Sequence, residues 1–214
     1  MVDTAKQALS ALSDTRFTTY WLDSLDPVAD EAALEQDTTC DLLVVGGGFC
    51  GLWAAIQAKE QDPERNVLLI EAKSVANGAS GRPAAIMSTS VMHGIDNTER
   101  IFPHDVAELE QLGRENMDGF QQAVERYGID CDLEWGGEMK VSIGDEGLAT
   151  VEEDYQLYLK YGHEAVKLDK AGMQAEIKSP LFHGGAWSKK RSGTVHPGKL
   201  VRGLKQAALK LGVR

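Results

Sequence analysis

The chain has 214 residues, a formal net charge of -11 at pH 7, 43% hydrophobic residues and 26% charged residues. These values are typical of a packed globular domain and differ from those of disordered or collagen-like chains. The negative charge argues against a nucleic-acid partner, because phosphate binding requires clustered Lys and Arg. No apolar run approaches the roughly 20 residues that span a bilayer, and the first 14 residues lack a signal pattern, so we expect a cytoplasmic protein without a membrane span.

Residues 1–38 are polar and acidic and contain a small aromatic group, Phe17, Tyr20 and Trp21. This composition predicts an irregular leader segment that packs on the surface of the following domain. The three cysteines, Cys40, Cys50 and Cys131, are an odd number without CxxC spacing. The sequence therefore predicts buried thiols rather than a disulfide framework or a metal site.

A strand, helix, strand pattern follows the leader. Residues 42–45 form an apolar run that glycines stop, as expected for a central parallel strand buried on both faces. Residues 67–70 form a second apolar run. Positions at helical spacing lie between the two runs: Leu52, Ala55, Ile56 and Lys59. The sequence thus predicts a βαβ unit of about 30 residues.

The next segment, residues 73–98, is rich in Gly, Ser, Ala and Asn and has no clear period. It predicts a long loop with one short helical stretch. Apolar positions over residues 105–127 then recur at amphipathic helical spacing, and Gly128 is a natural residue to end that helix.

The remaining elements are predicted from turn signals and periodicity. Residues 131–135 and 138–143 flank Gly136-Gly137, which predicts a β-hairpin. Further helices are expected over residues 146–161 and 170–177, and a strand over residues 182–189. A last helix is expected to begin at Pro197, with His196 serving its start.

The glycine motif Gly46-Gly47-Gly48-Phe49-Cys50-Gly51 fits GxGxxG and lies between the first predicted strand and the helix. In this context the first glycine permits a tight turn, the second lets the backbone approach a pyrophosphate, and the third lets the helix pack on the strand. The backbone N–H groups and the helix dipole then attract the phosphates. The pattern predicts a dinucleotide site.

An acidic residue, Glu71, ends the second predicted strand about 20 residues after the glycines, and Ala72 follows it. A carboxylate at this place accepts hydrogen bonds from ribose hydroxyls and disfavours a 2′-phosphate, so NADP is not expected. FAD and NAD both remain possible from this unit alone. The loop Gly78-Ala79-Ser80-Gly81-Arg82 then offers a hydroxyl and a guanidinium for the second phosphate and the flavin side.

These segments resemble the D-amino-acid-oxidase-like family of FAD-dependent oxidoreductases, which includes glycine oxidase and sarcosine oxidase. The resemblance implies FAD as the cofactor, oxidation of a C–N bond by hydride transfer to the flavin, and reoxidation by molecular oxygen. It implies that Gly46, Gly48 and Gly51 contact the pyrophosphate, and that Phe49 and Cys50 belong to the same cofactor-binding segment. It further implies that Glu71 contacts the adenosine ribose, with Ala72 beside it as a cofactor-binding residue, and that Ser80, Gly81 and Arg82 contact the phosphate or flavin side.

The chain departs from the family in two ways. Pro83-Ala84-Ala85 stands where family members commonly have Asn-Gly-Gly. Two alanines restrict the backbone near the flavin, which puts a substrate specificity taken from the family in doubt. Family members are also considerably longer than 214 residues.

The resemblance and the element pattern together predict an α/β fold. We expect a Rossmann-like FAD-binding βαβ domain followed by the beginning of a mixed α+β substrate domain. The expected boundaries are a leader at residues 1–38, the FAD-binding unit and flavin-side loop at 39–103, a helical and hairpin part at 104–190, and a returning helix at 191–214.

The flavin performs the redox step in this chemistry, so no acid–base pair is required and the sequence leaves the catalytic residues unassigned. Five histidines are scattered, and His93 is the best placed of them because it follows the flavin-side loop. Trp135 could line a substrate cavity or belong to the core. Asp130, Asp132 and Glu134 alternate on one face of a presumed strand, where they could bind an ammonium group or be solvated.

The leading hypothesis is an FAD-dependent oxidase of a small amine, such as a γ-glutamylated polyamine, or of an amino acid. The alternative is a non-catalytic or truncated dinucleotide-binding module. The Gly-Ala-Ser-Gly-Arg loop disfavours an NAD-dependent dehydrogenase. The sequence leaves the oligomeric state open.

Overall fold

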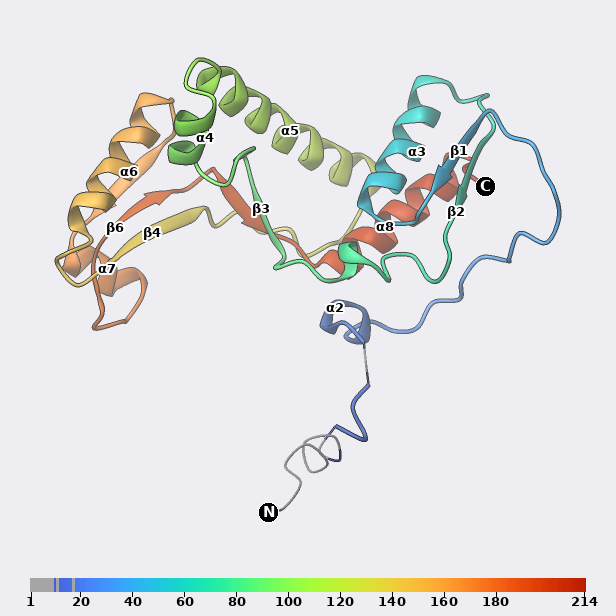
Figure 1. Ribbon diagram of the computed structural model, residues 1–214, viewed down its shortest axis with the longest axis horizontal. Helices are drawn as coiled ribbons and strands as arrows, with labels where there is room; N and C mark the ends of the chain where they lie inside the picture. The colour runs from blue at the N-terminus through green and yellow to red at the C-terminus, as the bar shows by residue number, and fades with distance from the viewer. Residues whose placement is uncertain (1–9, 11, 17) are drawn as a thin grey trace.

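The computed structural model describes residues 10, 12–16 and 18–214. Phe17, which belongs to the predicted aromatic group, lies outside the described residues. Two sheets lie toward opposite ends of the molecule, and a long helix and a short strand pair lie between them (Figure 1). Within the part of the chain that the structure describes, no helix is long and apolar enough to cross a membrane.

The predicted βαβ unit is present with the expected strand bounds. β1 (Leu42–Val45) pairs in parallel with β2 (Val67–Ile70), with Leu42 opposite Val67 and Val45 opposite Ile70. α3 (Phe49–Gln61) connects them and packs beside α8 (Pro197–Lys210). Apolar residues of these helices form the main core: Leu52, Ala55, Ile56, Leu200, Val201 and Leu204. The predicted helical spacing therefore marks the buried face of α3.

The burial of β1 differs from the prediction. Val44 is buried under α3, whereas Leu43 and Val45, on the opposite face, are 50% and 75% exposed. Side chains alternate between the two faces of a strand, so only one face of β1 is covered. The prediction that residues 42–45 are buried on both faces is wrong for this chain.

The predicted loop over residues 73–98 contains three short elements: η1 (Ala79–Gly81), β3 (Ile86–Ser88) and the start of α4 (Ile95–Ile101). β3 pairs antiparallel with β7 (Ser192–Thr194), more than 100 residues later in the chain. A three-residue strand is too short to show a period of two, so the sequence gives no local signal for it.

α5 (Val106–Tyr127) and α8 follow the predictions closely. Gly128 ends α5 with φ of 61°, in the left-handed region that glycine adopts without strain. His196 is the N-cap of α8, and its Nδ1 accepts a hydrogen bond from the Lys199 N–H at 3.2 Å. The prediction that His196 serves a helix start is confirmed.

The predicted hairpin around Gly136-Gly137 is wrong. β4 (Glu138–Ile143) pairs with β6 (Phe182–Ser188), which also pairs with β5 (Ala165–Leu168) to give an antiparallel sheet in the order β4-β6-β5. Residues 131–135 form only an isolated bridge between Glu134 and Thr194. The Gly137 N–H donates to the carbonyl of Ser192, so the chain turns toward β7 instead of folding back on itself.

Two helices cover the β4-β6-β5 sheet. α6 (Leu148–Lys160) and α7 (Lys170–Glu176) match the predicted helices, and β6 matches the predicted strand. β5 was not predicted. In the leader, α2 (Tyr20–Asp23) packs on the surface of the domain, where the Trp21 indole N–H donates to the carbonyl of Pro83 at 2.9 Å. The predicted surface packing of the leader is confirmed for these residues.

A buried ionic cluster connects α5 with the segments that lead into β5 and β7. Arg191 Nη1 lies 2.6 Å from Glu110 Oε2, and His163 Nε2 lies 2.7 Å from the same oxygen. The side chains of Arg191 and Glu110 are 1% and 2% exposed. Burial raises the pKa of Glu110, but the His163 hydrogen bond and the Arg191 charge outweigh this effect and hold the pKa below its ordinary value.

We predict that Glu110→Gln lowers the free energy of unfolding by up to about 3–5 kcal/mol, because it removes the buried carboxylate beside Arg191 and leaves only that of Glu138, which is 32% exposed and lies 3.5 Å from Arg191 Nε. Denaturant unfolding at pH 7 measures the change. Glu115→Gln, an exposed position on the same helix, is the control and should have little effect.

The pH dependence follows from the lowered pKa of Glu110. The stabilisation is present above the pKa of the unfolded state and is lost as the pH falls through the pKa of the folded state. The difference between the wild type and Glu110→Gln should therefore shrink in acid. A difference that does not change with pH would contradict this assignment.

Candidate cofactor-binding site

The glycine motif forms the turn between β1 and α3. Gly46 has φ of 106°, which a residue with a side chain rarely adopts. A methyl group on Gly51 would clash with the carbonyl oxygen of Gly46, and one on Gly48 would lie 2.8 Å from the Ser80 hydroxyl. The three positions therefore require glycine for three different reasons: a turn, close approach of another group, and helix packing.

Glu71 lies directly beside this turn. Its carboxylate accepts hydrogen bonds from the Gly47 N–H at 2.7 Å and from the Lys73 N–H at 3.0 Å. These backbone donors, that of Gly47 most strongly, hold the pKa of Glu71 below its ordinary value. An ionised carboxylate has about four acceptor positions, so Glu71 can accept further hydrogen bonds from a ligand hydroxyl. Ala72 follows it at an exposed position.

Ser80 brings the flavin-side loop to the N-terminus of α3. Its Oγ accepts a hydrogen bond from the Phe49 N–H at 2.9 Å. The N-cap of α3 is Gly48, which has no side chain to bond the first-turn N–H groups. The positive end of a 13-residue helix therefore lies between the glycine turn and Ser80.

The other predicted site residues contact only nearby backbone groups or are exposed to solvent. Gly81 is buried against the carbonyl of Ala76. Arg82 is exposed, and its guanidinium donates to the carbonyl of Asn77 at 2.9 Å. Cys50 lies in the first turn of α3 and is exposed, and Cys40 is partly exposed, so the prediction of buried thiols holds only for Cys131.

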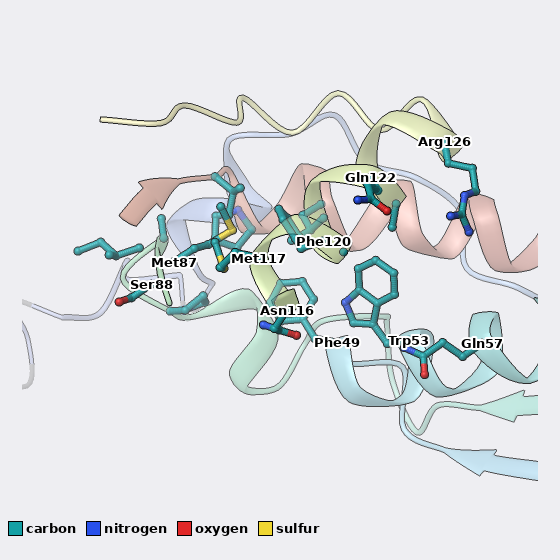
Figure 2. Close-up of a pocket in the computed structure, with 18 of the residues that line it drawn as sticks. Phe49, Trp53, Gln57, Met87, Ser88, Asn116, Met117, Phe120, Gln122 and Arg126 are labelled. Carbon is teal, nitrogen blue, oxygen red and sulfur yellow. The ribbon is translucent and has the colours of Figure 1, made fainter. Parts of the chain in front are cut away.

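A pocket of about 730 Å³ opens beside the first turn of α3. Figure 2 shows Phe49 and Trp53 of α3 facing Met117 and Phe120 of α5, with Met87 of β3 at one end. The rings of Trp53 and Phe120 pack edge to face with centroids 6.4 Å apart. This apolar pocket is contiguous with the N-terminus of α3 through Phe49. The pocket was not predicted from the sequence. Three of its lining residues, Phe49, Trp53 and Gln57, are four residues apart and therefore share one face of α3.

A second, polar pocket of about 380 Å³ lies between the segment after β3 and strand β4. Its lining includes Ser88, Ser90, His93 and Glu138. His93 has φ of 61°, a conformation that costs energy for a residue with a side chain. The structure therefore places His93 in a polar recess rather than in the apolar pocket beside α3.

The remaining candidates are not brought into either pocket. Asp132 has φ of 51° and its carboxylate pairs with Lys199, and Glu134 bridges to Thr194. Because residues 131–135 do not form a regular strand, the proposed acidic face of Asp130, Asp132 and Glu134 does not exist. Trp135 is 39% exposed and packs on Gly193.

The other three histidines lie outside both pockets. His163 belongs to the buried ionic cluster, His183 lies 2.8 Å from Asp145, and His104 is exposed. Among the described residues, no group of three or more His, Cys, Asp and Glu side chains has an arrangement that could hold a metal ion.

The DAO family, described as FAD dependent oxidoreductase, matches residues 41–214. The chain belongs to this family. It is 32% identical over 188 residues to the gamma-glutamylputrescine oxidoreductase of Escherichia coli, covering 86% of this chain and 43% of that protein. It is 28% identical over 198 residues to the probable oxidoreductase OrdL of Haemophilus influenzae, covering 91% of this chain and 45% of that protein. The chain thus spans less than half the length of these curated relatives.

Solved structures show the same fold. Glycine oxidase from Geobacillus kaustophilus superposes with a TM-score of 0.65 at 21% identity, covering 82% of this chain and 45% of that one. L-amino acid deaminase from Proteus vulgaris superposes with a TM-score of 0.66 at 19% identity, covering 88% of this chain and 42% of that one. The predicted α/β fold with a Rossmann-like βαβ unit is confirmed, and it matches part of the fold of these FAD-dependent oxidoreductase structures.

We predict that Gly51→Ala lowers the free energy of unfolding by about 1–3 kcal/mol or more, because the methyl group forces the backbone of α3 away from Gly46. Gly119→Ala is the matched control, since Gly119 lies in the exposed middle of α5 with open space around it. That variant should gain about 1 kcal/mol from helix propensity. Denaturant unfolding of both variants measures the difference, and a neutral Gly51→Ala would contradict the close packing.

Proposed function

We propose that this chain binds FAD at the turn between β1 and α3. The residues that would hold the cofactor belong to the glycine turn, the end of β2 and the flavin-side loop. They are Gly46, Gly48, Phe49, Cys50 and Gly51 for the pyrophosphate, Glu71 and Ala72 for the adenosine ribose, and Ser80, Gly81 and Arg82 for the phosphate or flavin side. Residues 39–103 would form the FAD-binding unit.

The observation that carries this proposal is the convergence of three elements on the N-terminus of α3. The first turn of the helix, in which only the Phe49 N–H is bonded by a side chain, that of Ser80, favours a negative charge by about 0.3–1 kcal/mol, and its remaining N–H groups are donors for phosphate oxygens. Glu71 on one side is an acceptor for ribose hydroxyls. Ser80 on the other side can donate its hydroxyl hydrogen to a phosphate, because its oxygen already accepts from Phe49.

The segment Pro83-Ala84-Ala85, which departs from the family pattern, is held to the rest of the structure by a backbone hydrogen bond. Ala85 has φ of 66°, the left-handed conformation that glycine adopts without cost, and its carbonyl accepts a hydrogen bond from the Val195 N–H at 3.0 Å. This bond extends the β3–β7 pairing toward the loop. The backbone at Ala85 therefore keeps a glycine-type conformation where family members have Asn-Gly-Gly, and Ala84 and Ala85 each add a methyl group.

We further propose that the complete enzyme oxidises a C–N bond of an amine or amino acid. FAD, when bound, supplies a hydride acceptor, and molecular oxygen would then take up the two electrons to give hydrogen peroxide. The E. coli relative, whose name states a γ-glutamylputrescine substrate, supports an amine. The fold alone does not decide this, because L-alpha-glycerophosphate oxidase from Mycoplasma pneumoniae superposes with a TM-score of 0.64.

The proposed compartment is the cytoplasm. All three cysteines are free thiols, a pattern that fits a reducing compartment.

A second candidate is a nucleotide-binding module that does not turn over as an isolated chain. The observation that favours it is that the chain spans 43% and 45% of its curated relatives. Visible absorbance of the purified chain, with and without added FAD, tests the binding that both candidates share. Peroxide release with γ-glutamylputrescine or glycine then separates them. A chain that neither contains nor takes up flavin would contradict both.

We predict that Glu71→Ala weakens ADP binding about 10- to 100-fold, because it removes a charge-assisted hydrogen bond to the ribose worth about 1.5–3 kcal/mol. Since Glu71 also holds the Gly47 N–H, the variant could loosen the glycine turn itself. These effects are separated by measuring the affinity of the wild type and of Glu71→Ala for both ADP and 2′-deoxy-ADP. If Glu71 contacts the ribose directly, the variant should lose much less affinity for 2′-deoxy-ADP than for ADP.

Calorimetric titration of both nucleotides measures these affinities. Glu64→Ala, an exposed glutamate before β2, is the control and should bind both like the wild type. Equal losses for ADP and 2′-deoxy-ADP would show that Glu71 acts only through the turn.

A further inference from the structure

The leader follows the candidate cofactor site from β2 to the flavin-side loop. The Ser74 hydroxyl, in the segment after β2, donates to the Asp30 carboxylate at 2.9 Å. α2 lies next to η1 (Figure 1), where a methyl group on Gly81 would be 3.3 Å from Leu22 Cδ1. The family match begins at residue 41, so the leader residues that make these contacts lie outside it.

Trp21 of α2 contacts both the segment after the flavin-side loop and the start of α8. Its indole N–H donates to the carbonyl of Pro83 at 2.9 Å. Its ring packs edge to face on the ring of His196, the N-cap of α8, with centroids 5.2 Å apart. A methyl group on Gly198 would clash with the Trp21 carbonyl oxygen. Trp21 therefore lies between Pro83 and the first turn of α8.

The contacts of His196 fix α2 in this position. Because Nδ1 accepts from the Lys199 N–H, the neutral ring carries its hydrogen on Nε2, which donates to Ser24 Oγ at 3.2 Å. Ser24 is the C-cap of α2, and Thr19 at the N-cap accepts from the Leu22 N–H. A four-residue helix is not stable alone, so its place is set by what it contacts. α2 is thus anchored on α8.

Two hydrogen bonds hold the segment Pro83-Ala84-Ala85, one at each end. The Pro83 carbonyl accepts from Trp21, and the Ala85 carbonyl accepts from the Val195 N–H at 3.0 Å. Ala85 has φ of 66°, a conformation that persists only when the surrounding structure holds it. One of the two bonds comes from β7's neighbour Val195 and the other from the leader.

We propose that Trp21 is a positioning residue for the flavin half of FAD. This inference rests on the proposed function, in which Ser80, Gly81 and Arg82 face the phosphate or flavin side. Trp21 acts through Pro83. By holding the segment that follows Arg82 in one conformation, it spares the bound cofactor the cost of ordering that segment. The adenosine half would bind at Glu71, which Trp21 does not hold, so FAD and ADP should respond differently to its loss.

The test variant is Trp21→Phe in the full 214-residue chain. Phenylalanine keeps an aromatic ring against His196 and removes only the N–H donor to Pro83. Calorimetric titration should show that the affinity for FAD falls about 3- to 10-fold, the effect of one hydrogen bond, while the affinity for ADP is unchanged.

Trp187→Phe is the matched control. The indole N–H of Trp187 also donates to a backbone carbonyl, that of Gly136, at 3.0 Å, and both tryptophans are partly exposed. Trp187 lies on β6, away from the candidate cofactor site. This variant should bind FAD and ADP like the wild type, and both variants should keep the circular dichroism of the wild type.

Amide hydrogen exchange without cofactor tests the anchor by itself. In Trp21→Phe the Val195 amide, which bonds Ala85, should exchange about 3- to 10-fold faster. The Thr194 amide, which bonds Glu134, should not change in either variant. An unchanged Val195 amide would overturn the anchoring role of Trp21. Equal changes in FAD and ADP affinity, or no change in either, would overturn its role toward the flavin half.

Failure of the proposed function is distinguishable from failure of this inference. A wild type that takes up no FAD would contradict the proposed function and, with it, the flavin role of Trp21. The Val195 amide would still show whether Trp21 holds the segment. A wild type that binds FAD as tightly as Trp21→Phe would retain the proposed function and overturn the inference alone.

Discussion

The close approach of α3 to the end of β1 is the constraint on which the candidate site depends. Because a methyl group at Gly51 would clash with the Gly46 carbonyl, only glycine lets the helix begin directly over the turn. This fixes the direction of α3, whose apolar face then packs on β1, β2 and α8. The same geometry places the first turn of α3 between Glu71 and Ser80. Core packing and the geometry of the proposed phosphate site thus both follow from one backbone contact.

The second constraint is the buried ionic cluster, which fixes the segment that precedes β7. Arg191 bonds Glu110 through its side chain, and its carbonyl accepts from the Thr89 N–H. Thr89 directly follows β3, so the cluster holds the β3–β7 pair against α5. β3 forms one end of the apolar pocket and directly follows the loop that is proposed to face the flavin. A charged interaction far from the glycine turn therefore positions the opposite wall of the site.

The sequence predicted correctly those elements whose pattern lies within one segment of the chain. The GxGxxG turn, the two parallel strands and the long helices α5 and α8 each depend on spacing within one segment, and the structure has them at the predicted positions. Prediction failed where pairing is long-range. β3 finds its partner more than 100 residues away, and residues 131–135 bridge to β7 rather than to β4. Likewise, no sequence pattern shows that Gly47 and Lys73 donate to Glu71, because backbone donors carry no residue signature.

The disagreement at β1 has a different cause. Residues 42–45 are all apolar, a pattern that indicates burial on both faces, yet the structure covers only the face that carries Val44. A strand with one face toward solvent normally alternates apolar and polar residues, so Leu43 and Val45 would be expected to be polar if this face stayed open. The all-apolar pattern of residues 42–45 therefore does not distinguish a strand that is covered on both faces from one that is covered on a single face.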